Sequence, residues 1–363
     1  MEQRKLAVSG DDKGRTNGVD SVAARKADHL EICLSQDVSF RALTTGFEQI
    51  QLLHCALPEV ALERVDTGTT FLGRALSMPL MITGMTGGFA QAEEVNTRLA
   101  QACKSQRVAL GLGSQRQLLE NQQHVRSFSA VREVAPDIPL VGNIGVAQVA
   151  QRGGLGAVER IMRMVEVDAL AVHLNPLHEA LQPEGDTDFG GVLAALQQLV
   201  EELPVPVIVK ETGAGISKEV AQRLADIGVR YIDVSGAGGT SWAAVEYYRG
   251  ADPRLAEKFW DWGIPTALCL QELRSIPGLH LLASGGVRDG LDVAKALALG
   301  AEMAGAAAPF LRALFGKEGP TVEELISQWR EEFRLAMFLT GCAEVDRLRE
   351  VRYFLKGRFM EGC

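Results

Sequence analysis

Residues 279–288 read Leu-His-Leu-Leu-Ala-Ser-Gly-Gly-Val-Arg, and a helical pattern of apolar residues follows from Leu291 to Leu299. The apolar run 279–283 predicts a buried strand. Gly285 and Gly286 come directly after that strand and before the helix, where free backbone N–H groups can hold a phosphate. The stretch therefore predicts a strand, a phosphate-binding loop and a helix in direct succession.

Similar apolar runs recur along the chain, and most are followed by a helical period. They lie near residues 79–83, 108–112, 139–144, 168–174, 205–210, 229–234 and 301–305. Eight such units favour an α/β fold of the closed (β/α)8 TIM-barrel type. An open Rossmann sheet is the alternative, but no G-x-G-x-x-G follows the first strand and no acidic residue is placed for a ribose. The stretch at 279–288 is the seventh unit, and the loops after strands 7 and 8 commonly hold phosphate in such barrels.

The 363 residues suffice for one barrel domain, assigned to 25–363, with a core at about 78–315. Residues 1–24 are polar and are expected to form a disordered extension. Residues 25–77 are expected to cap the barrel or its bottom face. C-terminal helices are expected over 321–340, with Thr321 as N-cap. On the helix after strand 7, Lys295 is expected to face solvent.

Composition narrows the class of protein. The chain has neither an apolar run of 18 residues nor a secretory h-region, so a cytoplasmic protein without a membrane partner is expected. Its six cysteines are scattered and are expected to be reduced thiols. The net charge of −9 argues against nucleic acid as a partner. An anionic substrate would need a local cationic pocket.

Polar residues at the predicted strand ends are the candidate site, because barrel active sites lie at the carboxyl ends of the strands. Lys210 follows the apolar run 205–209, where a buried lysine is costly without a partner. It would supply a positive charge to a phosphate or a flavin ring, or it would pair with a carboxylate such as Glu211 or Glu184.

Two glycine-rich loops add to these candidate residues at the strand ends. Gly236, Gly238 and Gly239 precede Thr240 after strand 6, beside the loop after strand 7. The run from Gly84 to Gly88 would bring backbone close to a flat ring, with a flexible turn as the equally open alternative.

His173, Asn175, His178 and Glu179 lie within seven residues, directly after strand 4. Two histidines with a carboxylate favour acid–base or metal work over a buried core histidine. The spacing His-x4-His-Glu is not a closed zinc ligand set, and a single carboxylate near phosphates suits Mg²⁺ better.

Taken in order, eight short motifs resemble those of the type 2 isopentenyl-diphosphate isomerases. They span Arg25 to Trp242, and the likeness extends to about Ala307: Arg25-Lys26-x-Asp28-His29, His54-Cys55-Ala56-Leu57-Pro58-Glu59, Met85-Thr86-Gly87-Gly88, Gly113-Ser114-Gln115-Arg116, His173-Leu174-Asn175-Pro176, Gln182-Pro183-Glu184-Gly185-Asp186, Val209-Lys210-Glu211 and Ser235-Gly236-Ala237-Gly238-Gly239-Thr240-Ser241-Trp242. The resemblance implies an isomerase of isoprenoid biosynthesis that interconverts isopentenyl and dimethylallyl diphosphate. It also implies reduced FMN as acid and base, NADPH as reductant, Mg²⁺, and a homo-tetramer or homo-octamer.

The resemblance also implies roles for individual residues. FMN contacts fall on Gly84, Met85, Thr86, Ser114, Asn143, Lys210, Ser235, Thr240, Gly285, Gly286, Ala306 and Ala307. The residues implied to bind substrate are Arg25, Lys26, Ser114 and His178. The implied catalytic residues are His178, His173 and Asn175, and the implied metal ligand is Glu179. The family usually has glutamine where this chain has His178.

Two alternatives stay open. One is an FMN-dependent 2-hydroxy acid oxidase or dehydrogenase, although such enzymes carry His-Gly-Gly where this chain has Ala237-Gly238-Gly239. The other is a catalytically altered flavin-binding barrel, which the histidine at position 178 motivates.

Overall fold

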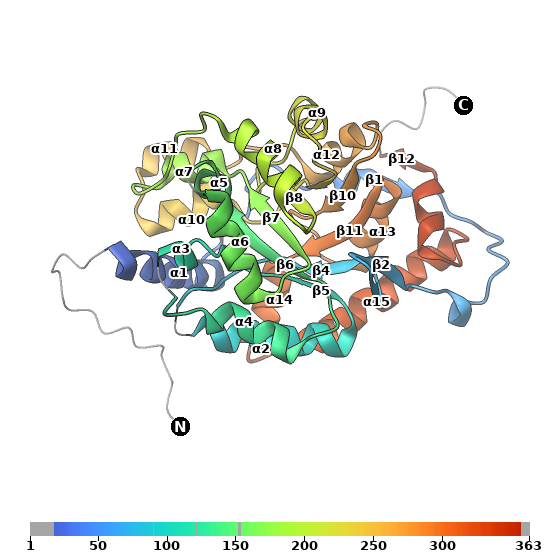
Figure 1. Ribbon diagram of the computed structural model, residues 1–363. Helices are drawn as coiled ribbons and strands as arrows, with labels where there is room; N and C mark the ends of the chain where they lie inside the picture. Colours follow the sequence, from blue (N-terminus) through green and yellow to red (C-terminus); the bar gives the residue numbers. More distant parts are fainter. Residues whose placement is uncertain (1–17, 90, 121, 152–153, 357–363) are drawn as a thin grey trace.

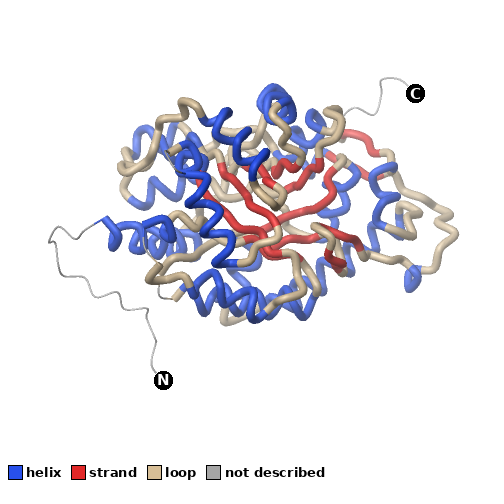
Figure 2. The backbone as a smooth tube through the Cα atoms, viewed as in Figure 1, coloured by secondary structure: helices blue, strands red, loops and turns tan. Residues whose placement is uncertain are grey.

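The computed structural model describes residues 18–89, 91–120, 122–151 and 154–356. Its centre is a closed barrel of parallel strands in the order β10-β11-β4-β5-β6-β7-β8-β9, surrounded by helices (Figures 1 and 2). The barrel strands are β4 (Leu80–Ile82), β5 (Ala109–Gly111), β6 (Leu140–Gly145), β7 (Ala169–His173), β8 (Val207–Lys210), β9 (Tyr231–Asp233), β10 (His280–Ala283) and β11 (Ala301–Ala306). The predicted TIM barrel is confirmed, and the open sheet is excluded.

Each predicted apolar run coincides with one barrel strand. In β8, Val207, Ile208 and Val209 are buried, and Lys210 at the strand's end is partly exposed. Strands covered on both faces read as continuous apolar runs, which is why the sequence locates them so well. Two strands, β6 and β11, extend one residue beyond their predicted runs.

Helices follow or flank the strands on the outside of the barrel. They are α2 (Ala92–Gln106), α3 (Gln117–Glu120), α4 (Arg126–Val134), α5 (Val146–Ala150), α6 (Gly154–Val165), α7 (Pro176–Leu181), α8 (Val192–Glu202), α9 (Lys218–Asp226), α10 (Trp242–Arg249), α11 (Pro253–Lys258), α12 (Thr266–Leu273), α13 (Gly290–Ala298) and α14 (Ala308–Phe315). None of the described helices is long and apolar enough to cross a membrane. The five cysteines in the described part of the chain are unpaired thiols, as expected.

The segment before the barrel covers both of its ends. A hairpin of β2 (Thr69–Phe71) and β3 (Arg74–Leu76) packs Phe71 and Leu76 against side chains of the barrel interior, among them Met81 and Val141. This hairpin precedes β4 directly, so it closes the N-terminal end of the barrel. The expectation that residues 25–77 cap a barrel face holds for the hairpin.

Helix α1 (Gly18–Ser35) covers the opposite end, where the strands have their carboxyl ends. Its Lys26 Nζ donates to the carbonyl of Gly87, 2.7 Å away, in the loop after β4, and to that of Ser114, 2.6 Å away, after β5. The helix begins at Gly18, so the expectation of a disordered extension is wrong for residues 18–24. Residues 1–17 lie outside the described part of the chain.

The segment after the last barrel strand packs against the outside of the barrel and includes a long helix and a short strand. Helix α15 (Val322–Leu339) begins with a capping box in which Thr321 and Glu324 bond each other's backbone N–H groups, as the N-cap prediction requires. Strand β12 (Tyr353–Leu355) pairs antiparallel with β1 (Ile50–Leu52). The expectation that Lys295 faces solvent is wrong in part, because the residue is half-buried and its Nζ donates to the Phe47 carbonyl at 2.9 Å.

Candidate active site

The barrel register aligns three polar side chains at the mouth. His173 on β7 pairs with Lys210 on β8, and Lys210 pairs with Asp233 on β9. Lys210, Asp233 and Asn143 line a hollow in the mouth, together with Gly84. The carboxyl ends of the strands therefore bring together residues that lie far apart in sequence, as expected for a barrel of this type.

His173 is a neutral hydrogen-bonding group in this row. Its Nδ1 lies 2.8 Å from Asn143 Oδ1. Burial, with the Lys210 ammonium as the next cause, lowers the pKa of His173 to about 3. The imidazole therefore stays uncharged around neutral pH and orients the Asn143 amide.

Lys210 forms no ion pair with a carboxylate of the described residues, although such an ion pair was the alternative to a flavin role. Its Nζ donates to the backbone carbonyl of Glu211. The Glu211 side chain is buried, and it accepts hydrogen bonds from the backbone N–H groups of Thr212 at 2.5 Å and Ala214 at 2.7 Å. Burial still raises the pKa of Glu211, against the effect of these bonds. The Lys210 charge is therefore left facing the mouth of the barrel.

The two glycine loops after β9 and β10 lie against each other. Gly285 and Gly286 have φ values of +100° and +77°, which favour glycine. A Cβ on Gly285 would stand 2.2 Å from the Gly236 carbonyl oxygen, and one on Gly239 would stand 2.6 Å from the Gly286 nitrogen. Side chains are excluded at both loops, so their backbone is left to form the wall of a ligand site.

The loop after β4 also leaves no room for a side chain at a glycine. A Cβ on Gly84 would overlap the Leu112 carbonyl oxygen at 1.9 Å. Nearby, Thr86 Oγ1 and Gln115 Nε2 are buried and have no hydrogen-bond partner among the described residues. Buried polar atoms of this kind are expected to have partners, so these two atoms fit a bound polar ligand such as a flavin.

The remaining predicted cofactor positions lie at or after the carboxyl ends of barrel strands. Met85 packs against the core beside Thr86, and Ser235 is buried with a φ of 37°. Thr240 forms a bridge with Ser39, from the segment after α1. Ala306 ends β11, and Ala307 is the N-cap residue of α14.

A cluster of cations covers the mouth from α1. Burial, followed by the charges of Arg25 and Arg116, lowers the pKa of Lys26 to about 7. Burial and Arg116 likewise lower the pKa of Arg25. Arg25 Nη1 reaches the Gln182 side chain at 3.1 Å and Glu184 at 3.8 Å. The chain thus gathers positive charge at this point despite its net charge of −9.

The predicted group after β7 divides into two parts. Asn175 takes a positive φ of 41° before Pro176 begins α7, and its Nδ2 donates to Glu179 Oε1 at 2.9 Å. The second oxygen of Glu179 accepts from the Asp186 backbone N–H at 2.8 Å. His178 points away from this pair, toward α10.

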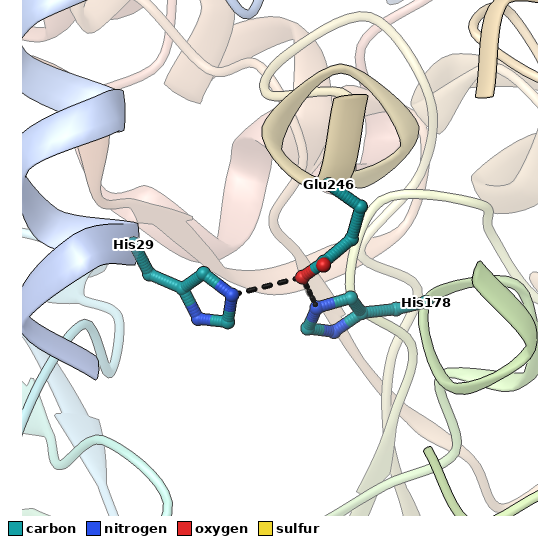
Figure 3. A group of neighbouring side chains, drawn as sticks. All are labelled: His29, His178 and Glu246. Carbon is teal, nitrogen blue, oxygen red and sulfur yellow. Dashed lines mark hydrogen bonds and ion pairs between the residues drawn. The ribbon is translucent and has the colours of Figure 1, made fainter. Parts of the chain in front are cut away.

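Glu246 on α10 is the partner of His178. His178 Nε2 and His29 Nε2 each lie 2.8 Å from the same oxygen, Glu246 Oε1, as Figure 3 shows. Arg249 Nε donates to the other oxygen at 2.8 Å. Burial raises the pKa of Glu246, but the bonds from His178 and His29 outweigh it and hold the pKa well below its usual value.

Sequence reasoning missed Glu246, Asp233 and Arg116 as site residues. Arg116 and His29 stood within quoted motifs, and His29 lies four residues after Arg25 on one face of α1. For Glu246 the sequence shows only that a glutamate occurs in the helix that Ser241 caps, and nothing local marks it as a site residue. Its burial follows from packing against α1 and α7, which the sequence does not show.

Comparison with known proteins defines the class first. Residues 20–126 and 178–353 match the family model described as FMN-dependent dehydrogenase. Solved structures of mandelate oxidase share the fold: the complex with benzoyl-formic acid has a TM-score of 0.63 at 19% identity, covering 93% of this chain and 97% of that one. The protein is an FMN-binding barrel of this class.

The curated relatives are more specific. Isopentenyl-diphosphate delta-isomerase of Pyrococcus abyssi is 47% identical over 343 residues, 92% of each chain. The enzymes of Cronobacter sakazakii and Archaeoglobus fulgidus are 46% and 45% identical, covering 91% and 94% of this chain and 96% and 98% of theirs. The chain belongs to the FMN-dependent isopentenyl-diphosphate delta-isomerases.

Proposed function

We propose that this isomerase interconverts isopentenyl and dimethylallyl diphosphate at the barrel mouth, beneath α1. The observation that carries the proposal is the position of Arg25, Lys26 and Arg116. The charges of Arg25 and Arg116 lie close enough to Lys26 to lower its pKa, and Lys26 bonds directly to the loops after β4 and β5. A diphosphate held there lies against the flavin loops.

FMN would be held by the predicted residues around the hollow. The backbone of Gly285 and Gly286, at the end of β10, suits the phosphate, and Lys210 and Asn143 suit the ring. Reduced FMN, with NADPH as the electron source, supplies a group that adds a proton at one carbon and removes one from another, with no net redox change. The protein contributes position, fixed charge and a site shielded by α1.

Mg²⁺ would be bound at Glu179 together with the substrate. The carboxylate is already oriented by Asn175 and by the Asp186 backbone, so it presents its remaining lone pairs in a fixed direction. Mg²⁺ commonly uses one or two carboxylates plus substrate phosphates. Replacing Glu179 with glutamine should raise the Mg²⁺ concentration needed for half-maximal activity.

Roles follow for the three proposed catalytic residues. His173 is neutral and keeps the Asn143 amide oriented. Asn175 orients Glu179, and Ser114 contributes the carbonyl that holds Lys26. His178, on α7, bonds to Glu246 and is proposed to contact the substrate.

The 2-hydroxy acid oxidase alternative has less support. Ala237 occupies the position of the expected catalytic histidine, and it is fully buried against the Pro265 segment. An alanine has no group to accept a proton, so no base is available at this position. The catalytically altered barrel is the alternative that the experiment must exclude.

The test is an anaerobic assay of purified protein with FMN, NADPH, Mg²⁺ and isopentenyl diphosphate, with dimethylallyl diphosphate measured as product. Changing Arg25 and Lys26 to alanine should raise the KM while FMN absorbance on the protein stays unchanged. Lys104→Ala, on the exposed face of α2, is the matched control. Bound, reduced flavin without product would reject the proposal and favour the altered barrel.

Assembly and location complete the proposal. We propose a homo-tetramer or homo-octamer located in the cytoplasm, which the family resemblance supports. Light scattering of the purified holoenzyme tests the first, and fractionation of the source cells tests the second.

A further inference from the structure

We propose that His29, His178 and Glu246 form a binding site for a divalent late transition-metal ion of the Zn²⁺ type. The three donors are His29 Nε2, His178 Nε2 and Glu246 Oε1. They come from α1, α7 and α10, and Figure 3 shows both imidazoles pointing toward the Glu246 carboxylate. This site is separate in its donors from the Mg²⁺ position proposed at Glu179.

The distances suit an ion. Both imidazole nitrogens lie 2.8 Å from the carboxylate oxygen, and all three donors lie within 4.8 Å of one another. Zinc bonds of about 2.0–2.2 Å in tetrahedral geometry put neighbouring donors roughly 3.3–3.5 Å apart. The two histidine–carboxylate contacts need to open by only about half an ångström to admit the ion.

The donor chemistry selects the metal. Two imidazoles and one carboxylate are a common set for Zn²⁺ and its neighbours, whereas Mg²⁺ takes oxygen ligands almost exclusively. With three protein ligands, a fourth position is left for water or for a substrate oxygen. Each neutral imidazole binds through Nε2 once its proton resides on Nδ1, so ligation needs no change in net charge.

The surroundings hold the donors in place. Glu246 is fully buried, while the side chains of His29 and His178 are 13% and 12% exposed. Arg249 holds Glu246 Oε2 at 2.8 Å, which leaves Oε1 for the ion. The Arg249 charge opposes a cation, but its Nη1 also pairs with Glu184 at 2.9 Å, which offsets part of that charge. The Trp242 ring packs against both imidazoles, with centroids 4.4 and 5.3 Å away.

The structure shows that the neighbours of His178 in sequence do not complete this site. His173 and Glu179, its neighbours in sequence, bond to Asn143 and Asn175 instead. Only the packing of α1 and α10 supplies the second imidazole and the carboxylate. A bound ion would join α1, which carries Arg25 and Lys26, to the barrel.

The chain offers a matched control at the other end of the barrel. His280 Nδ1 lies 2.8 Å from Glu302 Oε1, and the Tyr231 ring stacks on the imidazole. This pair has the same distance and the same chemical groups but no second imidazole. It should therefore bind Zn²⁺ far more weakly.

Calorimetric titration of the holoenzyme with Zn²⁺, in excess Mg²⁺ to fill oxygen sites, tests the proposal. One Zn²⁺ per chain should bind to the wild type. His178→Gln and His29→Gln should each weaken binding at least about tenfold, because each removes one ligand. His280→Gln should leave the affinity unchanged, and circular dichroism shows that each variant is folded. X-ray absorption of the zinc-loaded protein should show two imidazole ligands and no sulfur.

Three results would overturn the proposal. The first is the absence of stoichiometric Zn²⁺ binding to the wild type. The second is equal affinity in wild type and folded His178→Gln, and the third is sulfur ligation, which would assign the ion to a cysteine. None of these outcomes depends on isomerase activity, so the metal site and the proposed function fail or survive separately.

Discussion

The charge on Lys26 makes substrate capture sensitive to pH. Its ammonium is enclosed by the Gly87 and Ser114 carbonyls and lies 5.6 Å from the centre of the Phe128 ring. Burial, followed by the charges of Arg25 and Arg116, lowers the pKa of Lys26 to about 7. A lysine carries its charge below its pKa, so the cation that attracts the diphosphate is present below about pH 7 and is lost above it.

The size of the effect follows from a single proton. About one-tenth of the free enzyme is charged at Lys26 one pH unit above the pKa, and about one-hundredth two units above. Because kcat/KM reports ionisations of the free enzyme, kcat/KM for isopentenyl diphosphate should fall about tenfold per unit above pH 7. The substrate itself gains negative charge as pH rises, so it cannot cause a fall in this direction.

The assay is an anaerobic rate measurement from about pH 6 to 9 with saturating FMN, NADPH and Mg²⁺. Lys26→Arg keeps a charge throughout this range and should flatten the fall. Lys26→Met has no charge and should be weak at every pH, also without the fall. A flat wild-type profile, or an unchanged fall in folded Lys26→Met, would refute the reasoning.

Three further predictions concern the barrel and its supports. Lys210→Ala should weaken FMN binding, measured by fluorescence titration, and Lys104→Ala should not; equal affinities would contradict a flavin role for Lys210. Asp233 is buried and bonds Ser284 through its side chain at 2.7 and 2.9 Å, so Asp233→Asn should lower the free energy of unfolding by about 1–3 kcal/mol in urea titrations. Thr321→Ala removes one half of a capping box and should cost about 1 kcal/mol, whereas a loss within error would show that the cap is not needed.

The barrel could be predicted because its strands depend on local composition. A parallel strand covered on both faces needs an unbroken apolar run, and the residue after the run is then at the mouth. Lys210 and His173 were found from their positions at the ends of predicted strands, and the register does place His173 beside Lys210. The strand ends therefore carry most of what the sequence can say about the site.

Helix α1 shows where such reasoning ends. Residues 18–24 directly follow the polar, charged stretch 1–17, and from the sequence they were assigned with it to one extension. The helix is fixed by distant contacts: Lys26 to the loops after β4 and β5, and His29 to Glu246. Contacts between residues separated by up to 217 positions leave no local pattern. The prediction that Lys295 faces solvent was inaccurate for the same reason, because its partner, the Phe47 carbonyl, lies 248 positions away in sequence.

Histidine stands at position 178, where the family resemblance leads us to expect glutamine, and the structure gives a physical reason why the imidazole can be accommodated. A glutamine there would offer an N–H donor to Glu246 Oε1, and the imidazole offers the same donor through Nε2. The exchange therefore preserves the bond that joins α7 to α10. What it adds is a second ring nitrogen and a second imidazole beside His29, 5.4 Å away between ring centroids. His178→Gln should consequently keep isomerase turnover and lose only the Zn²⁺ affinity, whereas His178→Ala removes the donor and leaves Glu246 with one fewer partner in a fully buried position. If His178→Ala is as active as the wild type, the bond between α7 and α10 is dispensable for the reaction, and position 178 does not contact the substrate.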